Sequence, residues 1–222
     1  MRLVFVPGFS QTQQTWAGVT TLVAAESLAV DVPTGLSFPE TAGALADLGG
    51  GATYVGYSMG GRLCLRLALD RPQVVERLVL VSASPGIADP ERRAARRADD
   101  ERLALDAERD GADSFLERWL AQPLFATLPR GGSARSARIH DVAVLAHQLR
   151  ALGQGAMEPL WDRLGELTMP VVLVVGGLDE KYGGLAHEMA AHLHDARVHV
   201  IAGAGHAVHL EAPGALARAL GT

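Results

Sequence analysis

Short runs of consecutive apolar residues, separated by stretches with helical spacing, restrict the fold of this chain more than any other feature. A strand that is buried on both faces does not show the apolar–polar alternation of a half-exposed strand. The runs therefore predict a mostly parallel sheet with helices on both faces, which is an α/β fold. The expected strands are residues 3–6, 28–32, 53–56, 78–82, 171–175 and 198–201. Residues 207–220 are expected to form a closing helix.

The pattern changes between residues 86 and 159. This stretch has no good strand and many helix formers, and prolines at 123 and 129 interrupt it. It predicts a helical cap inserted at the rim of the sheet. A chain of 222 residues is long enough for one domain with a real core. We therefore expect a single domain over residues 1–222, with its core in 1–85 and 160–222 and its cap in 86–159.

Composition excludes several classes of protein. The net charge of -5 argues against a nucleic-acid-binding domain. No apolar run approaches the ~18 residues of a membrane span, and no signal peptide is visible, so we expect a cytoplasmic protein. The single Cys64 excludes an internal disulfide and a cysteine-rich metal site. We expect no metal and no organic cofactor. Lys181 is the single lysine, so all the other basic residues counted with it are arginines. This bias towards arginine suits a GC-rich bacterial genome.

Residues 56–60, GYSMG, fit the G-x-S-x-G pattern. They follow an expected strand and open an expected helix, which is the context that a nucleophile elbow requires. In such an elbow a sharp turn lifts the serine Oγ above the sheet, and the flanking glycines let the backbone approach closely. The positive end of the following helix favours a developing anion. The motif predicts that Ser58 is the reactive serine.

A reactive serine needs a base, and the base needs an acid that orients it. In α/β-hydrolases the chain order is serine, acid, histidine. His206 lies in a glycine-flanked loop after the last expected strand, and Asp179 directly follows the strand before it. We therefore expect a Ser58–His206–Asp179 triad. His209 is open to two interpretations: a rim or substrate-contact residue, or one with a local structural role or solvent exposure.

An oxyanion hole needs two N–H donors aimed at the developing negative charge. The residue after the nucleophile, Met59, is expected to supply one backbone N–H. The loop after the first strand is expected to supply the other, from Phe9.

With the triad placed, the chain resembles the 2-succinyl-6-hydroxy-2,4-cyclohexadiene-1-carboxylate synthases, lyases of menaquinone biosynthesis with the α/β-hydrolase fold. The resemblance rests on GFSQTQQTW (8–16), GYSMGGR (56–62), ERRAARRADDERLA (91–104), FLERWLAQPLFATL (115–128), GGLDEKY (176–182) and GHAVHLEAP (205–213). The elbow alone fits many activities. The arginine-rich segment and the WxxQPxF element are far more specific.

The resemblance implies a reaction. The family eliminates pyruvate from 2-succinyl-5-enolpyruvyl-6-hydroxy-3-cyclohexene-1-carboxylate. The triad serine would act as a base on a ring proton, without an acyl-enzyme, and the oxyanion hole would stabilise the enolate-like carbonyl. We therefore expect a small substrate with several carboxylates as the partner of this chain, with no nucleic acid and no membrane. We expect a monomer or a small homo-oligomer.

The resemblance also implies substrate-binding residues. Arginine suits a carboxylate because its planar fork binds both oxygens. The residues that match the family are Tyr57, Arg62, Arg96, Trp119, Arg138 and Lys181. Phe125 is expected in the core, and for Trp119 a packing role is weighed equally. The sequence departs from the family at Pro7, where a histidine is common, and at Leu120, where some relatives have a tyrosine. The family's first strand hairpin has no counterpart, since the chain starts almost directly at Leu3.

Two alternatives stay open. A carboxylesterase or thioesterase would use the same triad through an acyl-serine, and it predicts a largely apolar pocket with few cations. A non-catalytic ligand receptor on this fold would be expected to lack a member of the triad. The arginines count against the first alternative, and the complete triad counts against the second.

Overall fold

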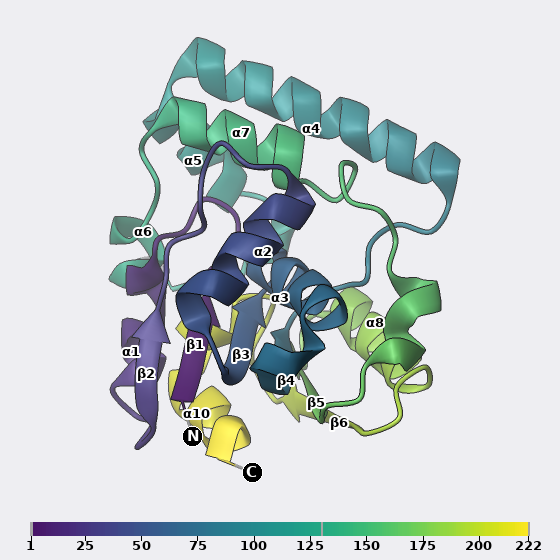
Figure 1. Cartoon of the computed structure of the whole chain (residues 1–222). Coiled ribbons are helices and arrows are strands. Elements are labelled where there is room, and N and C mark those ends of the chain that lie inside the picture. Colours follow the sequence, from purple (N-terminus) through teal and green to yellow (C-terminus); the bar gives the residue numbers. More distant parts are fainter. Residues whose placement is uncertain (1, 130, 222) are drawn as a thin grey trace.

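The computed structural model describes residues 2–129 and 131–221 of the chain (Figure 1). Its strands form one sheet in the order β2-β1-β3-β4-β5-β6, and every neighbouring pair is parallel. The strands are β1 (Arg2–Val6), β2 (Glu26–Ala29), β3 (Ala52–Tyr57), β4 (Val75–Val81), β5 (Val171–Gly176) and β6 (Ala196–Ile201). The expected α/β fold is therefore confirmed. Each expected strand overlaps an observed one, although β2 begins and ends earlier than predicted.

Successive residues of the central strands pack on opposite faces of the sheet. Val4 belongs to one buried apolar cluster, and its neighbours Leu3 and Phe5 belong to another. The first face is covered by α2 (Phe38–Gly49), α3 (Met59–Asp70) and α8 (Glu180–Ala190). The second is covered by η1 (Gln13–Trp16), α1 (Ala17–Thr20), α9 (Val208–Glu211) and α10 (Pro213–Gly221). Burial on both faces explains why the strand sequences do not alternate.

The end of the chain corrects one expectation. Residues 207–220 were predicted as a single helix, but α9 ends at Glu211 and α10 begins at Pro213. Pro213 has no N–H to donate, and its ring clashes with a helical turn before it. The break places α9 directly after the loop that holds His206.

Helical elements fill the chain between β4 and β5. They are α4 (Pro90–Asp110), α5 (Ala112–Leu120), η3 (Pro123–Phe125), α6 (Ser133–Ser136), α7 (Val142–Leu152) and η4 (Trp161–Glu166). In Figure 1, α4 and α7 lie side by side across one end of the molecule. Ala104 and Ala107 of α4 pack with Leu145 and Leu149 of α7 in a small apolar cluster of their own. The small side chains on α4 allow the two helices to approach closely.

Figure 1 also shows the cap helices lying across the end of the sheet. The loops that hold Ser58, Asp179 and His206 follow the carboxyl ends of β3, β5 and β6, where ligands bind in open α/β sheets. Within the described ranges, no helix combines the length and the apolar character that crossing a membrane requires.

Candidate active site

The predicted triad residues meet at the carboxyl end of the sheet. Ser58 directly follows β3, Asp179 caps the N-terminus of α8 after β5, and His206 lies in the loop after β6. His206 Nε2 is 3.3 Å from Ser58 Oγ, and His206 Nδ1 is 2.6 Å from Asp179 Oδ2. Because the Asp179 carboxylate accepts, Nδ1 carries the proton of a neutral ring and Nε2 is left as a base. This arrangement can draw the proton from the serine hydroxyl.

The elbow around Ser58 explains the glycines of its motif. Ser58 has a φ of 50°, in the left-handed region that L-residues rarely adopt. A Cβ on Gly56 would lie 2.5 Å from the carbonyl oxygen of Gly60, and a Cβ on Gly60 would collide with the backbone of Val6 and Pro7. The turn is therefore possible only with glycine at these two positions. It leaves Ser58 partly accessible at the start of α3.

Glu211 holds the histidine loop, and the sequence reasoning missed it. Its carboxylate accepts from the backbone N–H groups of Gly205 and Ala207 at 2.7 and 2.9 Å, on either side of His206. These contacts fix the backbone that carries the imidazole of the candidate triad. The signal in the sequence is a carboxylate a few residues after a glycine-flanked histidine. Such a carboxylate can accept from the backbone N–H groups of a tight loop, which have no partner in a helix or strand.

His209 lies behind the site rather than at its rim. It is 1% exposed, and its ring packs 4.2 Å from that of Tyr57 and 4.7 Å from that of Trp16. Neither ring nitrogen has a hydrogen-bond partner within the described ranges. Burial lowers the pKa of His209 well below its ordinary value, and nearby Arg138 and His206 lower it further. The ring is neutral, so its role is local and structural. The interpretations of His209 as a substrate contact or an exposed residue are wrong.

A cavity of about 400 Å³ separates the triad from the cap. Ser58, Met59, His206 and Phe9 form part of its wall. Met59 is the first residue of α3, so its amide has no partner within the helix and is free to donate toward the cavity. Phe9 contributes from the loop after β1. The oxyanion hole from Met59 and Phe9 stays a prediction.

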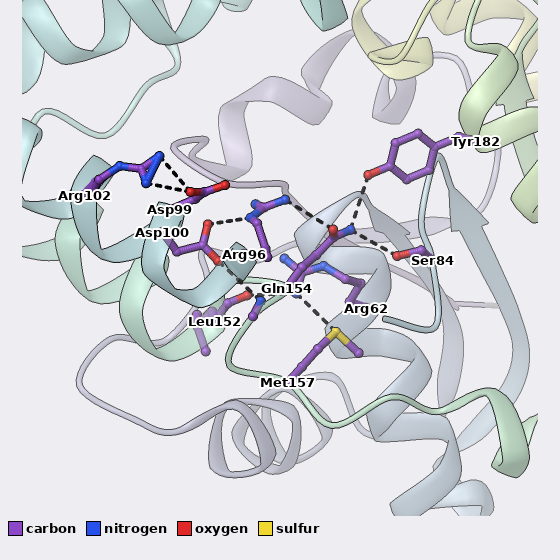
Figure 2. A network of polar contacts seen from close by, with 11 residues as sticks. Arg62, Ser84, Arg96, Asp99, Asp100, Arg102, Leu152, Gln154, Met157 and Tyr182 are labelled. Atoms are coloured by element: carbon purple, nitrogen blue, oxygen red, sulfur yellow. Dashed lines mark hydrogen bonds and ion pairs between the residues drawn. The ribbon is translucent and has the colours of Figure 1, made fainter. Parts of the chain in front are cut away.

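Arg62 reaches the cavity from α3, one turn after Ser58. It is 6% exposed, its Nη1 donates to the carbonyl oxygen of Leu152 at 2.9 Å, and Met157 Sδ lies 3.3 Å from the same nitrogen (Figure 2). Within the described part of the chain, Arg62 forms no ion pair with a carboxylate. Burial lowers its pKa to about 10.

Arg96 lies on α4 in a polar network that Figure 2 shows in full. Its Nε donates to Asp100 Oδ1 at 2.8 Å and its Nη1 to Gln154 Oε1 at 3.3 Å. Gln154 Nε2 in turn donates to Ser84 Oγ at 3.1 Å and contacts the Tyr182 hydroxyl at 3.4 Å. Gln154 thus joins the cap to the core. Neither Asp100 nor Gln154 was predicted, because their importance depends on contacts between distant segments.

Arg138 is the third predicted arginine, and it also lines the cavity. It lies between α6 and α7 and is 6% exposed. Its Nε donates to the carbonyl oxygen of Ala134 at 2.8 Å, and its Nη1 donates to Ser10 Oγ at 3.1 Å. Burial lowers its pKa. The structure thus brings all three predicted arginines to one cavity.

The remaining predicted residues also line this cavity. Tyr57 packs its ring 5.4 Å from His206, Trp119 packs 4.8 Å from the ring of Phe9, and Lys181 is exposed at the opening. Trp119 also packs against the apolar cluster of the cap, so it has a packing role and lines the cavity as well. Phe125 corrects an expectation: it is half-buried on the cavity wall, 6.2 Å from the His206 ring, and not in the core. It lies in the short helix η3, which leaves one side of its ring uncovered.

A serine on a nucleophile elbow, with a histidine and a carboxylate supplied by the following strands of a parallel sheet, defines the α/β hydrolases. The chain belongs to the alpha/beta hydrolase family, whose model matches residues 3–219.

Relatives with similar sequences confirm the resemblance to the 2-succinyl-6-hydroxy-2,4-cyclohexadiene-1-carboxylate synthases. A Bacillus subtilis protein named as a 2-succinyl-6-hydroxy-2,4-cyclohexadiene-1-carboxylate synthase is 36% identical over 72% of this chain and 60% of its own length. The synthase of Salmonella schwarzengrund is 33% identical, over 72% of this chain and 62% of its own length. The match thus spans about three fifths of these relatives.

Solved structures agree with the sequence relatives. MenH from S. aureus superposes with a TM-score of 0.92 and 26% identity, covering 99% of this chain and 91% of that one. A thermophilic esterase from Thermogutta terrifontis superposes with a TM-score of 0.79 and 19% identity, covering 99% of this chain and 88% of that one. The second match shows the fold alone.

Proposed function

We propose that this protein is a lyase of menaquinone biosynthesis that releases pyruvate from 2-succinyl-5-enolpyruvyl-6-hydroxy-3-cyclohexene-1-carboxylate. The observation that carries the proposal is the set of buried cations beside the triad. Arg62 and Arg138 are each 6% exposed and line the cavity that holds Ser58. A buried guanidinium without a counter-charge is costly, and an anionic substrate would supply that charge.

The chemistry follows from the geometry of the triad. His206 takes the hydroxyl proton of Ser58, and Asp179 stabilises the charged imidazole. The serine oxygen then removes a ring proton from the substrate. The electron pair of the broken C–H bond forms a new ring double bond, and the C–O bond to the enolpyruvyl group breaks. The departing enolpyruvate takes up the proton held by His206 and becomes pyruvate, which restores the triad. No acyl-serine forms.

The roles of the other site residues follow from this reaction. The amides of Met59 and Phe9 stabilise the carbonyl oxygen that gains charge as the proton leaves. Arg62, Arg96 and Arg138 bind carboxylates of the substrate, and Lys181 adds a cation at the opening. The aromatic side chains of Tyr57 and Trp119 pack against the ring of the substrate.

The esterase alternative uses the same triad but requires a different cavity. An ester or thioester substrate is held mostly by apolar contacts, and it gains nothing from three buried or half-buried arginines. The cavity does contain apolar groups, among them Leu103, Leu124 and Leu149. These suit the carbon ring of the proposed substrate as well as an ester, so it is the cations that favour the lyase.

The experiment is a direct assay of pyruvate release from the purified protein and the enolpyruvyl substrate, read through lactate dehydrogenase. We expect release by the unaltered chain and its loss in Ser58→Ala, at least about a thousandfold in kcat if the serine is the base. Ser136→Ala, on an exposed turn of α6, is the matched control. Wild-type release by Ser58→Ala would refute the serine base. Rapid hydrolysis of p-nitrophenyl esters without pyruvate release would establish the esterase instead.

A further inference from the structure

Gln148 is a buried polar side chain on the cavity wall to which the mechanism above gives no part. It lies on α7, is 1% exposed, and falls outside every segment that carries the family resemblance. Its Oε1 accepts from the backbone N–H of Ser10 at 3.0 Å. A backbone N–H can only donate, so this contact fixes the amide with its oxygen toward Ser10. The nitrogen Nε2 must then point elsewhere, and it has no partner within the described ranges.

Arg138 carries a second donor of the same kind. Its Nη1 donates to Ser10 Oγ at 3.1 Å, while its Nη2 is buried without a partner among the described residues. Gln148 and Arg138 therefore hold the same residue, Ser10, and both line the cavity. A buried donor that is left unpaired is unfavourable. Both residues line the cavity, and each has one buried N–H donor without an acceptor among the described residues.

Ser10 is the support on which this pair is built. It is fully buried, and its φ of 63° is unfavourable for a residue other than glycine. Its carbonyl oxygen accepts from the N–H of Ile139 at 2.9 Å, in addition to the contacts with Gln148 and Arg138. These three bonds, all to the segment that begins with Arg138, hold the unfavourable conformation. Ser10 also directly follows Phe9, so it fixes both donors relative to the loop expected to form the oxyanion hole.

We propose that Gln148 Nε2 and Arg138 Nη2 together bind one carboxylate of the substrate. The guanidinium supplies the charge, and the amide supplies a neutral donor to the second oxygen or to the same one. Gln148 is then a residue that determines specificity for an oxygen-rich anion at this end of the cavity. The identity of the ligand as the enolpyruvyl substrate rests on the proposed function.

Gln148→Glu separates binding from structural support. The glutamate keeps an oxygen that accepts from Ser10 and has almost the same size, but it replaces the free donor with a negatively charged oxygen. We expect KM for the enolpyruvyl substrate to rise about 10- to 100-fold, the effect of losing a hydrogen bond to a charged group, with kcat within about twofold. An unchanged KM would show that Gln148 only supports Ser10. Gln73→Glu, exposed in η2 (Pro72–Val74), makes the same charge change away from the cavity and should leave KM unaltered.

A second variant keeps the test possible if Gln148→Glu does not fold. If Gln148→Glu does not melt cooperatively, Gln148→Met takes its place, since it has similar volume and no charge. It also removes the acceptor of the Ser10 N–H, so kcat is read beside KM: loss of a substrate contact raises KM at nearly constant kcat, whereas a displaced Ser10 also moves the neighbouring Phe9 amide and lowers kcat. A folded variant whose KM stays within about twofold of the unaltered protein overturns the proposal.

A second ligand keeps the test independent of the proposed function. If the unaltered protein releases no pyruvate, the proposed function fails, and succinate titrated calorimetrically becomes the probe. We expect binding by the unaltered protein and at least about tenfold weaker binding by Gln148→Glu. Equal affinities, or no binding by the unaltered protein, overturn the proposal.

Discussion

Asp100→Asn tests how the cap positions Arg96, for which we propose a role in substrate binding. The Asp100 side chain is 3% exposed, and both of its partners are N–H donors: Arg96 Nε at 2.8 Å and the Gly155 amide at 3.4 Å. An asparagine presents one acceptor oxygen and one NH₂ group. Whichever way the new amide turns, one of the two donors faces another donor. The substitution therefore changes no volume but breaks one of the contacts.

The magnitude follows from the burial of the two partners. A hydrogen bond to a charged group contributes about 1.5–3 kcal/mol. Arg96 is 33% exposed, so solvent screens its side of the pair and the lower end of this range applies. A loss of about 1.5 kcal/mol in a chain of this size lowers Tm by roughly 3–6 °C. If Arg96 binds a substrate carboxylate, its lost orientation also raises KM about tenfold, since each ~1.4 kcal/mol is a factor of ten in affinity.

Calorimetric melting and the pyruvate-release assay measure the two effects separately. Asp106→Asn is the matched control, because Asp106 is on the same helix and pairs with Arg109, but its side chain is 39% exposed. We expect it to change stability by less than about 0.5 kcal/mol and to leave KM alone. A lower Tm for Asp100→Asn with unchanged KM would remove Arg96 from the substrate site. An unchanged Tm would refute the reasoning about the buried carboxylate itself.

Two further predictions concern the loop and helix around the catalytic histidine. Glu211→Gln should lower kcat about tenfold at constant KM in the pyruvate assay. The new amide can accept from only one of the Gly205 and Ala207 N–H groups, so His206 loses its fixed position. A change in KM alone would contradict this. His209→Phe should flatten the dependence of Tm on pH between about 7.5 and 5.5. Burial holds the pKa of His209 below its ordinary value. Below about pH 6.5 the unfolded chain therefore binds a proton that the folded chain does not. The free energy of unfolding then decreases as the pH falls, by up to ~1.4 kcal/mol per pH unit. Parallel Tm curves for the two proteins would show that His209 does not contribute.

Features that depend on neighbouring residues could be predicted from the sequence. The strands follow from short apolar runs, because β3 and β5 are buried on both faces of the sheet and have no exposed position that would favour a charged residue. Ser58, Asp179 and His206 follow from their position just after strands, since the carboxyl ends of parallel strands meet at one edge. The cap arginines were predicted to be near the site only because their motifs resemble those of a known family. Composition and periodicity contain no information about which distant residues lie close together.

Features that depend on contacts between distant segments required the tertiary structure. Gln148 is 138 residues from the Ser10 amide that fixes its orientation, and Arg62 is 90 residues from the carbonyl that holds it. Burial determines whether such a polar group needs a partner in the protein or a ligand. A glutamine in solvent forms hydrogen bonds with water, whereas a buried glutamine in a cavity wall with an unpaired N–H needs an acceptor. The same holds for His209, for which the sequence left a substrate contact or solvent exposure open, but whose ring packs against those of Tyr57 and Trp16. The sequence by itself thus determined the fold and the reactive groups, and the packing of the cap against the sheet decided which polar side chains are available to a ligand.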